Sequence, residues 1–357
     1  MSNHTYMFNT IEKTLFQSYS RRSVHKILLA NAIAGCMYPL TGMAMPERSI
    51  ADKRPVSFAT GTDRREMIAQ VLKPIEREIV KEISGKKKII IKCNLVAPEP
   101  LSATHVDAVR GILDVITRLY DGPIYVGDST GRTYPGPIGT MRHFEIHGYL
   151  DLPREYNNVK LLDLNDCNTN PLWILDDNQH PRPVNIIDTF LDPDVYNISL
   201  TRFKTHGRLI TVTLGVKNMV MGSPISHYRQ QAAAGRNEKV FMHSGEHSNL
   251  NVNMFFVAQR INVGLSVLDG FVGMEGNGAA QGTPVEHGVA LAGTDIVAVD
   301  KVGTHLMDID FEEVLYLKYC GDAGLGQSDL SSIDIIGPSL DEHIIQYRRH
   351  DNNPKLS

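Results

Sequence analysis

Segments with the apolar spacing of a helix alternate along most of the chain with short continuous apolar runs that are typical of buried strands. Residues 64–82 show helical spacing, and Pro74 is expected to kink or divide that helix. The β-branched run 88–93 predicts a buried strand. Further strands are predicted at 124–128, 159–164, 195–200 and 261–269, and further helices at 104–119 (capped by Thr104), 249–259 and 295–307. This alternation predicts an α/β fold with a mostly parallel sheet and helices on both faces, in a single large domain of one or two lobes.

Charge divides the chain into two parts. Residues 1–44 hold four basic side chains and one acidic side chain, whereas the other 313 residues hold 32 basic and 39 acidic ones. Arg21-Arg22 precedes a charge-free stretch, 27–45, that is too short and interrupted for a confident spanning helix. This order is typical of a twin-arginine export signal, with a cleavage site at the small residues 42–44. A rival interpretation is a lipoprotein box ending at Cys36. The interpretation without export is an amphipathic N-terminal helix of a cytosolic protein.

We therefore predict an export signal at 1–44, a linker at 45–60, the α/β domain at 61–340 and a polar tail at 341–357. The expected location is periplasmic or otherwise exported, with the twin-arginine machinery as a partner. Membrane contact is expected only through the signal or a lipidated Cys36. No block of like charge indicates nucleic-acid binding. The four cysteines are scattered without a C-x-x-C pair, which argues against a zinc finger, an iron–sulfur site and a disulfide scaffold.

Polar side chains cluster where the predicted strands end, which is where α/β proteins place their sites. Lysines, hydroxyls and helix N-termini that converge there favour an anionic group such as phosphate or carboxylate. Each residue taken alone is better explained as an ordinary turn residue, and it is their convergence that points to a site. The candidate catalytic residues are Lys204, His206 and Lys217, and the candidate ligand-binding residues are Lys92, Asn94, Thr104, Asp128, Ser129, Asn218, Gly222 and Asn277.

A divalent metal is a second possibility for the same region. His206, His243, Asp269 and Glu275 carry suitable ligand atoms, and His206 with a carboxylate could alternatively form an acid–base pair. Residues 243–247 formally match H-x-x-E-H, but Gly245 makes a poor interior for the continuous helix that this metalloprotease motif needs. A single His243 approaching the site is the better expectation.

Three common enzyme classes lack their motifs in this chain. There is no G-x-G-x-x-G opening a helix after the first strand, no G-x-x-x-x-G-K-[ST] and no G-x-S-x-G. A dinucleotide-binding Rossmann enzyme, a P-loop NTPase and an α/β hydrolase are therefore all disfavoured.

Several short motifs occur in a fixed order between about residues 56 and 310. They are KIIIKCN at 88–94, GDS at 127–129, KTH at 204–206, GVKN at 215–218 with Gly222, DG at 269–270, MEGNG at 274–278 and DIVAVD at 295–300. Together they resemble the domain of unknown function 362 family, which is sometimes found in iron–sulfur proteins and often carries export signals. Cys93 departs from the K-P-N that is usual in the family, and the ferredoxin-like cysteine clusters of some members are absent.

The resemblance supplies no reaction; together with the candidate site residues it favours an exported enzyme or cofactor-binding domain that takes a small anionic molecule or a metal. An association with redox chemistry through a redox partner protein is a further expectation, and no iron–sulfur cluster is expected from this chain alone. The alternative is a non-catalytic periplasmic binding or accessory protein for a redox enzyme. A weaker analogy is to lactate-racemase-like acid–base enzymes, which also place lysine and histidines after glycine-rich turns.

Overall fold

The computed structural model describes residues 55–131, 139–207, 210–226, 237–243 and 248–353. The predicted export signal, including Cys36, lies outside these residues, as does most of the H-x-x-E-H motif. No helix in the described ranges is long and apolar enough to cross a membrane.

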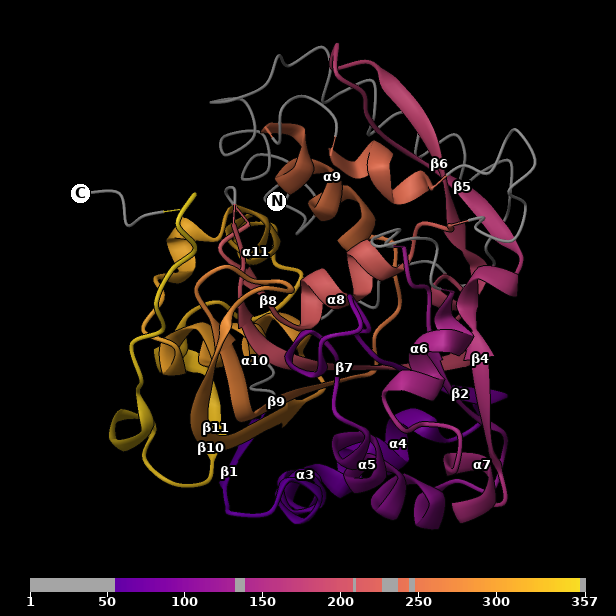
Figure 1. The fold of residues 1–357 in the computed structure, drawn as a ribbon, viewed down its shortest axis with the longest axis vertical. Helices are drawn as coiled ribbons and strands as arrows, with labels where there is room; N and C mark the ends of the chain where they lie inside the picture. Colours follow the sequence, from indigo (N-terminus) through magenta and orange to yellow (C-terminus); the bar gives the residue numbers. More distant parts are fainter. Residues whose placement is uncertain (1–54, 132–138, 208–209, 227–236, 244–247, 354–357) are drawn as a thin grey trace, which may run out of the picture.

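A nine-stranded, mostly parallel sheet forms the centre of the molecule (Figure 1). Its order is β11-β1-β10-β9-β7-β2-β3-β4, and β8 pairs with β7. The antiparallel pairs are β1 with β10, β10 with β9, and β7 with β8. The strands are β1 (Pro55–Thr60), β2 (Lys88–Lys92), β3 (Ile124–Asp128), β4 (Val159–Asp163), β7 (Val195–Thr205), β8 (Val212–Thr213), β9 (Leu265–Glu275), β10 (Thr283–Gly293) and β11 (Asp334–Ile336). The predicted α/β class is confirmed.

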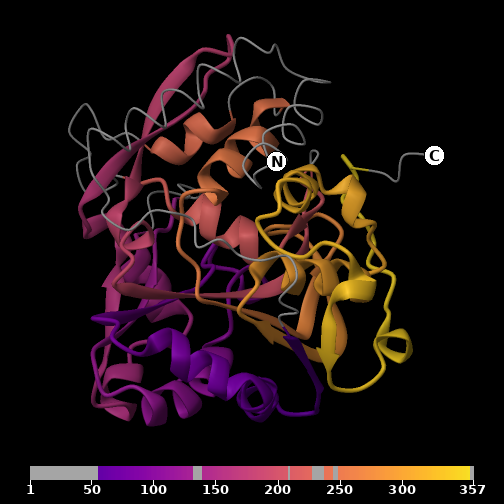
Figure 2. The same cartoon turned by 180° about the vertical axis from the view of Figure 1, so that it is seen from behind.

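Helices cover both faces of this sheet, as Figures 1 and 2 show from opposite sides. One face carries α3 (Arg64–Leu72), α4 (Glu76–Ile83) and α5 (Val106–Leu119). The other carries α8 (Gly215–Gly222), α9 (Ser248–Ala258), α10 (Ile296–Leu306) and α11 (Leu315–Asp322). Two short helices, α6 (Thr140–Ile146) and α7 (Leu152–Glu155), contact β4. Each face has its own cluster of buried apolar side chains, so the sheet is buried on both sides, as its β-branched strands require.

The predicted helix at 64–82 is divided where proline was expected to divide it. α3 ends at Leu72, a 3₁₀ turn occupies Lys73–Ile75, and α4 follows. Proline lacks the amide N–H and fixes φ, so it fits the start of a turn better than a helix interior.

The helix predicted from Thr104 starts differently. His105 is its N-cap, and the imidazole accepts a hydrogen bond from the Asp107 amide at 3.2 Å. Thr104 instead uses its hydroxyl to accept from the Asn94 amide and to donate to the Leu200 carbonyl. The threonine therefore fastens the loop after β2 to β7 rather than capping α5.

Three other segments differ from the sequence prediction. Residues 55–60, predicted as part of a linker, form β1 inside the sheet between β10 and β11. A two-stranded sheet of β5 (Thr169–Leu175) and β6 (Pro181–Ile187) was not predicted. β7 continues five residues beyond the predicted strand end at 200, so Lys204 lies within the strand rather than after it.

The segment 341–353, predicted as the start of a polar tail, packs back against the domain. The Ile345 amide donates to the Leu306 carbonyl, and the Tyr347 amide donates to the Met307 carbonyl. The Tyr347 ring is buried near Phe203. These contacts bring the residues that follow Tyr347 to the edge of the cavity described below.

Candidate functional site

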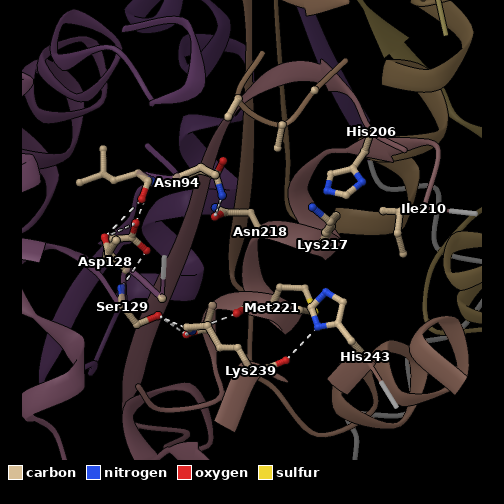
Figure 3. Close-up of a pocket in the computed structure, with 18 of the residues that line it drawn as sticks. Asn94, Asp128, Ser129, His206, Ile210, Lys217, Asn218, Met221, Lys239 and His243 are labelled. Atoms are coloured by element: carbon tan, nitrogen blue, oxygen red, sulfur yellow. Dashed lines mark hydrogen bonds between the residues drawn. The ribbon is translucent and has the colours of Figure 1, made fainter. Parts of the chain in front are cut away.

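A cavity of about 700 Å³ lies beyond the carboxyl ends of β2 and β3 and against α8 (Figure 3). β2 lies between β3 and β7 and is parallel to both, so the loops that follow these strands meet at one edge of the sheet. Asn94, Asp128 and Ser129 lie on one side of the cavity, and His206, Lys217 and His243 lie on the other (Figure 3). The predicted gathering of strand-end residues is therefore present.

Lys92 and Asp128 form a buried ion pair at the base of this cavity. Lys92 ends β2 and is 1% exposed. Its Nζ donates to Asp128 Oδ1 at 2.6 Å, to the Cys93 carbonyl at 2.6 Å and to Asn218 Oδ1 at 3.0 Å. Three acceptors satisfy the three N–H donors of the ammonium, which holds this cation firmly in place.

Asp128 also organises the backbone around it. Its Oδ2 accepts from the Leu95 amide at 2.7 Å, and its Oδ1 accepts from the Ser129 amide at 2.8 Å. The Ser129 hydroxyl in turn donates to the Gly222 carbonyl at the end of α8. Asp128 and Ser129 therefore tie the loop after β3 to the loop after β2 and to α8.

Asn218 and Gly222 place α8 against this ion pair. Asn218 Nδ2 donates to the Lys92 carbonyl at 3.1 Å and to Ser199 Oγ at 3.1 Å. A Cβ atom added to Gly222 would lie 2.1 Å from Lys92 Cε, so only glycine lets the helix approach the buried lysine this closely. Both residues were predicted to bind ligand directly; both line the cavity, and both also hold its wall together.

Lys204 lies behind the cavity wall. Its Nζ donates to Asn94 Oδ1 and to the Ser102 carbonyl, and its side chain is fully buried. Burial and the charges of Lys217 and Arg202 lower the pKa of Lys204 far below its usual value. Lys204 thus fixes the orientation of Asn94, whose side chain faces the cavity, rather than lining the cavity itself.

Lys217 projects into the cavity from the first turn of α8. The helix N-terminus is occupied by Asp300, whose two carboxylate oxygens accept from the amides of Gly215 at 2.8 Å and Val216 at 2.9 Å. Lys217 Nζ donates to Thr213 Oγ1 at 2.8 Å. Burial lowers the pKa of Lys217 to about 7, because desolvation disfavours the charged form.

His206 faces the same space from the end of β7. Its Nδ1 lies 2.9 Å from the Gly207 carbonyl, and a carbonyl oxygen can only accept, so Nδ1 must carry the proton. Burial and the Lys217 charge hold the pKa of His206 well below its usual range. The ring is thus a neutral imidazole with an unprotonated Nε2, the form that can accept a proton.

Lys239 is a cavity residue that the sequence did not indicate. Its Nζ donates to Ser129 Oγ at 3.0 Å and to the Met221 and Pro224 carbonyls at 3.0 and 2.7 Å. Burial and the Lys92 charge lower the pKa of Lys239 to about 7. It lies in the 3₁₀ segment Glu238–His243, which follows no strand of the sheet. A search for polar residues at strand ends therefore could not find it.

The four predicted metal ligands are not brought together. His206 and His243 both line the cavity, but Asp269 pairs with Arg64 of α3 at 3.1 Å, and Glu275 accepts from the Arg348 amide at 2.8 Å. Within the described ranges, no group of three or more His, Cys, Asp or Glu side chains is arranged to hold a metal ion. Asp269 lies apart from the two histidines because its carboxylate pairs with Arg64 of the helix layer on the opposite face of the sheet.

The C-terminal segment completes one wall of the cavity. Asn277 Nδ2 donates to Asp351 Oδ2 at 2.8 Å, and the Asp351 amide donates back to Asn277 Oδ1 at 3.1 Å. His350 and Asn352, on either side of Asp351, line the cavity together with Asn277. Asn277 was predicted as a ligand-binding residue, and its reciprocal bonds with Asp351 anchor this wall.

The cavity is lined by many basic side chains and few acidic ones. Among the described residues that line it, Asp128 is the single carboxylate, and it is already paired with Lys92. The basic side chains that line it are Lys92, Lys217, Lys239, His206, His243 and His350. Their balance favours an anion over a cation as occupant.

Comparison with known proteins places the chain in a family. A thylakoid-associated protein of Synechocystis sp. is 27% identical over 230 residues, a match that spans 62% of this chain and 64% of that relative. A crystal structure of a Thermotoga maritima protein is similar at 12% identity and a TM-score of 0.36, covering 74% of this chain and 59% of that one. The family described as domain of unknown function (DUF362) matches residues 89–305, which include all the strand-end residues of the cavity. The chain therefore belongs to the DUF362 family.

Proposed function

We propose that the cavity binds a small organic anion that carries a carboxylate or a phosphate group. The observation that carries this proposal is the excess of lysines over carboxylates among the lining residues. Lys92 is neutralised by Asp128, so Lys217 and Lys239 supply the positive charge that an anion would meet. Lys217 offers direct contact, because one of its N–H groups is taken by Thr213 and the others can reach into the cavity.

The same residues are suited to proton transfer on the bound anion. His206 presents an unprotonated Nε2, and Lys217, with a pKa of about 7, exists in both charged and neutral forms near neutral pH. A group whose pKa lies near the working pH, as that of Lys217 does, is an efficient general acid or base. We therefore propose acid–base chemistry on a small anion, with Lys217 and His206 as the proton carriers.

Binding of sulfate should weaken as the pH rises through 7. Sulfate keeps its double charge across this range, so the change reports the protein alone. An anion favours the charged lysines, and both Lys217 and Lys239 lose their protons above a pKa of about 7. Isothermal titration calorimetry between about pH 6 and about pH 8 should show a loss of about tenfold in affinity for each lysine that must be charged.

Two variants make this measurement specific. Lys217→Arg keeps its charge throughout and should flatten the pH profile, whereas Lys217→Met should weaken binding at low pH. Lys160→Met, at an exposed position on β4, should leave sulfate binding unchanged. An absence of sulfate binding at about pH 6, or equal effects of Lys217→Met and Lys160→Met, would refute the proposed anion site.

We also propose that the protein is exported by the twin-arginine route. The support is the order of features at residues 20–45 of the sequence, with Arg21-Arg22 ahead of a charge-free stretch. Replacing Arg21-Arg22 by Lys-Lys should leave the protein in the cytoplasmic fraction, as followed by cell fractionation and immunoblotting. Unchanged export of this variant would count against the twin-arginine route.

A further inference from the structure

The four lysines at the site have different hydrogen-bond environments. Lys92 donates to three acceptors, Lys204 donates to two, and Lys239 Nζ lies within hydrogen-bonding distance of four oxygens. In the described part of the chain, Lys217 Nζ has one such partner, the Thr213 hydroxyl. As a neutral amine, Lys217 can donate one N–H to Thr213 and still present its nitrogen lone pair to the cavity.

We propose that Lys217 is a nucleophile that forms an imine with a small 2-oxo acid. This inference rests on the proposed anion site and names its substrate class. A 2-oxo acid provides both groups that the cavity suits: a carboxylate for the charged lysine and an adjacent electrophilic carbonyl for the Lys217 amine. Lys217 and His206 flank the same part of the cavity, so the amine and a proton carrier both face the position of that carbonyl (Figure 3).

Imine formation needs only the Lys217 amine, the 2-oxo acid and the His206 imidazole as a proton relay. The Lys217 lone pair forms a bond to the carbonyl carbon while the C=O π electrons move to oxygen. A proton passes from the nitrogen to that oxygen by way of His206 Nε2, which gives a carbinolamine. The remaining N–H proton then passes by way of His206 Nε2 to the hydroxyl, which leaves as water as the C=N bond forms, so that the products are the neutral imine and water.

The environment also makes the amine available at neutral pH. With its pKa at about 7, about half of Lys217 is neutral at pH 7, about a thousandfold more than for an ordinary exposed lysine. Lys239 near Ser129 remains to balance the carboxylate, because a bound anion raises the pKa of a neighbouring lysine. In imine formation Lys217 acts in its neutral form and Lys239 carries the charge that balances the carboxylate, whereas sulfate, which has no carbonyl, is bound by both lysines in their charged forms.

Reductive trapping tests this assignment directly. The full-length protein is incubated with pyruvate and cyanoborohydride, and peptide mass spectrometry locates the reduced adduct. We expect the adduct on Lys217 in clear preference to exposed Lys160, with a rate that rises between about pH 6 and about pH 8. Lactate, which has the carboxylate but no carbonyl, should compete with pyruvate and form no adduct.

Variants separate the two proposals. Lys217→Arg should abolish the adduct, and His206→Asn should slow its formation. Sulfate titration of the wild-type protein gives an independent readout of the anion site, and Lys160→Met on exposed β4 should leave both measurements unchanged. Equal labelling of Lys217 and Lys160, or no adduct on a protein that binds sulfate, would overturn the nucleophile assignment and leave the anion site standing. A protein that binds neither sulfate nor pyruvate would overturn both.

Discussion

Replacing Lys92 with methionine should lower the free energy of unfolding by about 3–5 kcal/mol, the usual cost of leaving one partner of a buried ion pair uncompensated. The two side chains of the pair are 2% and 6% exposed, so water screens little of the remaining Asp128 charge. The Asn218 amide oxygen and the Cys93 carbonyl also lose their donor. Urea denaturation followed by circular dichroism measures this loss.

A second substitution distinguishes charge from packing. Adding Asp128→Asn to the Lys92→Met variant removes the uncompensated carboxylate, so a good part of the lost free energy should return. Lys160→Met on exposed β4 serves as the matched control and should change stability by less than about 0.5 kcal/mol. A Lys92→Met variant as stable as this control would show that the pair does not hold the strand ends together.

Asp300→Ala should cost about 2–4 kcal/mol of stability and disturb the cavity at the same time. The substitution leaves the buried amides of Gly215 and Val216 without their acceptors, and each unsatisfied buried donor costs about 1–3 kcal/mol. The first turn of α8 then loses its fixed position, and Lys217 lies in that turn. Thermal or urea unfolding measures the stability, and sulfate titration measures the effect on the cavity.

The pH dependence of this effect has a definite sign. Burial raises the pKa of Asp300 to about 7, so between about pH 4 and about pH 7 the folded protein holds a proton that the unfolded chain releases. The Asp300 contribution to stability is therefore largest below about pH 4 and falls as the pH rises through 7. The stability difference between wild type and Asp300→Asn should shrink over that range. A difference that grows with pH would contradict the assignment.

The strand ends were the predictable part of the site. Residues 88–92 and 124–128 are β-rich runs followed at once by polar residues, and parallel strands deliver such residues to one edge of the sheet. Lys92, Asn94, Asp128 and Ser129 accordingly meet at the cavity. Strand and helix periodicity was sufficient for these elements because the sheet is buried on both faces.

The errors have physical causes as well. β9 does not end at Asp269; it continues to Glu275 as one arm of an antiparallel pair with β10, so Asp269 lies mid-strand and pairs with Arg64. The β1 strand was not predicted because its six residues directly follow a charged, proline-containing stretch and were assigned with it to a linker. Lys239 reaches the cavity by tertiary packing of a segment without periodic pattern, which local sequence reasoning cannot place.

The wall formed by residues 350–352 has a consequence for the timing of ligand binding. Its anchor, the pair of bonds between Asn277 and Asp351, joins positions that are 74 residues apart. The cavity lysines Lys217 and Lys239 are synthesised well before that wall exists. On a ribosome, the cationic groups would therefore be assembled while one side of the cavity is still open. The cavity therefore reaches its final shape only after residues 350–352 have been synthesised and Asp351 has packed against Asn277.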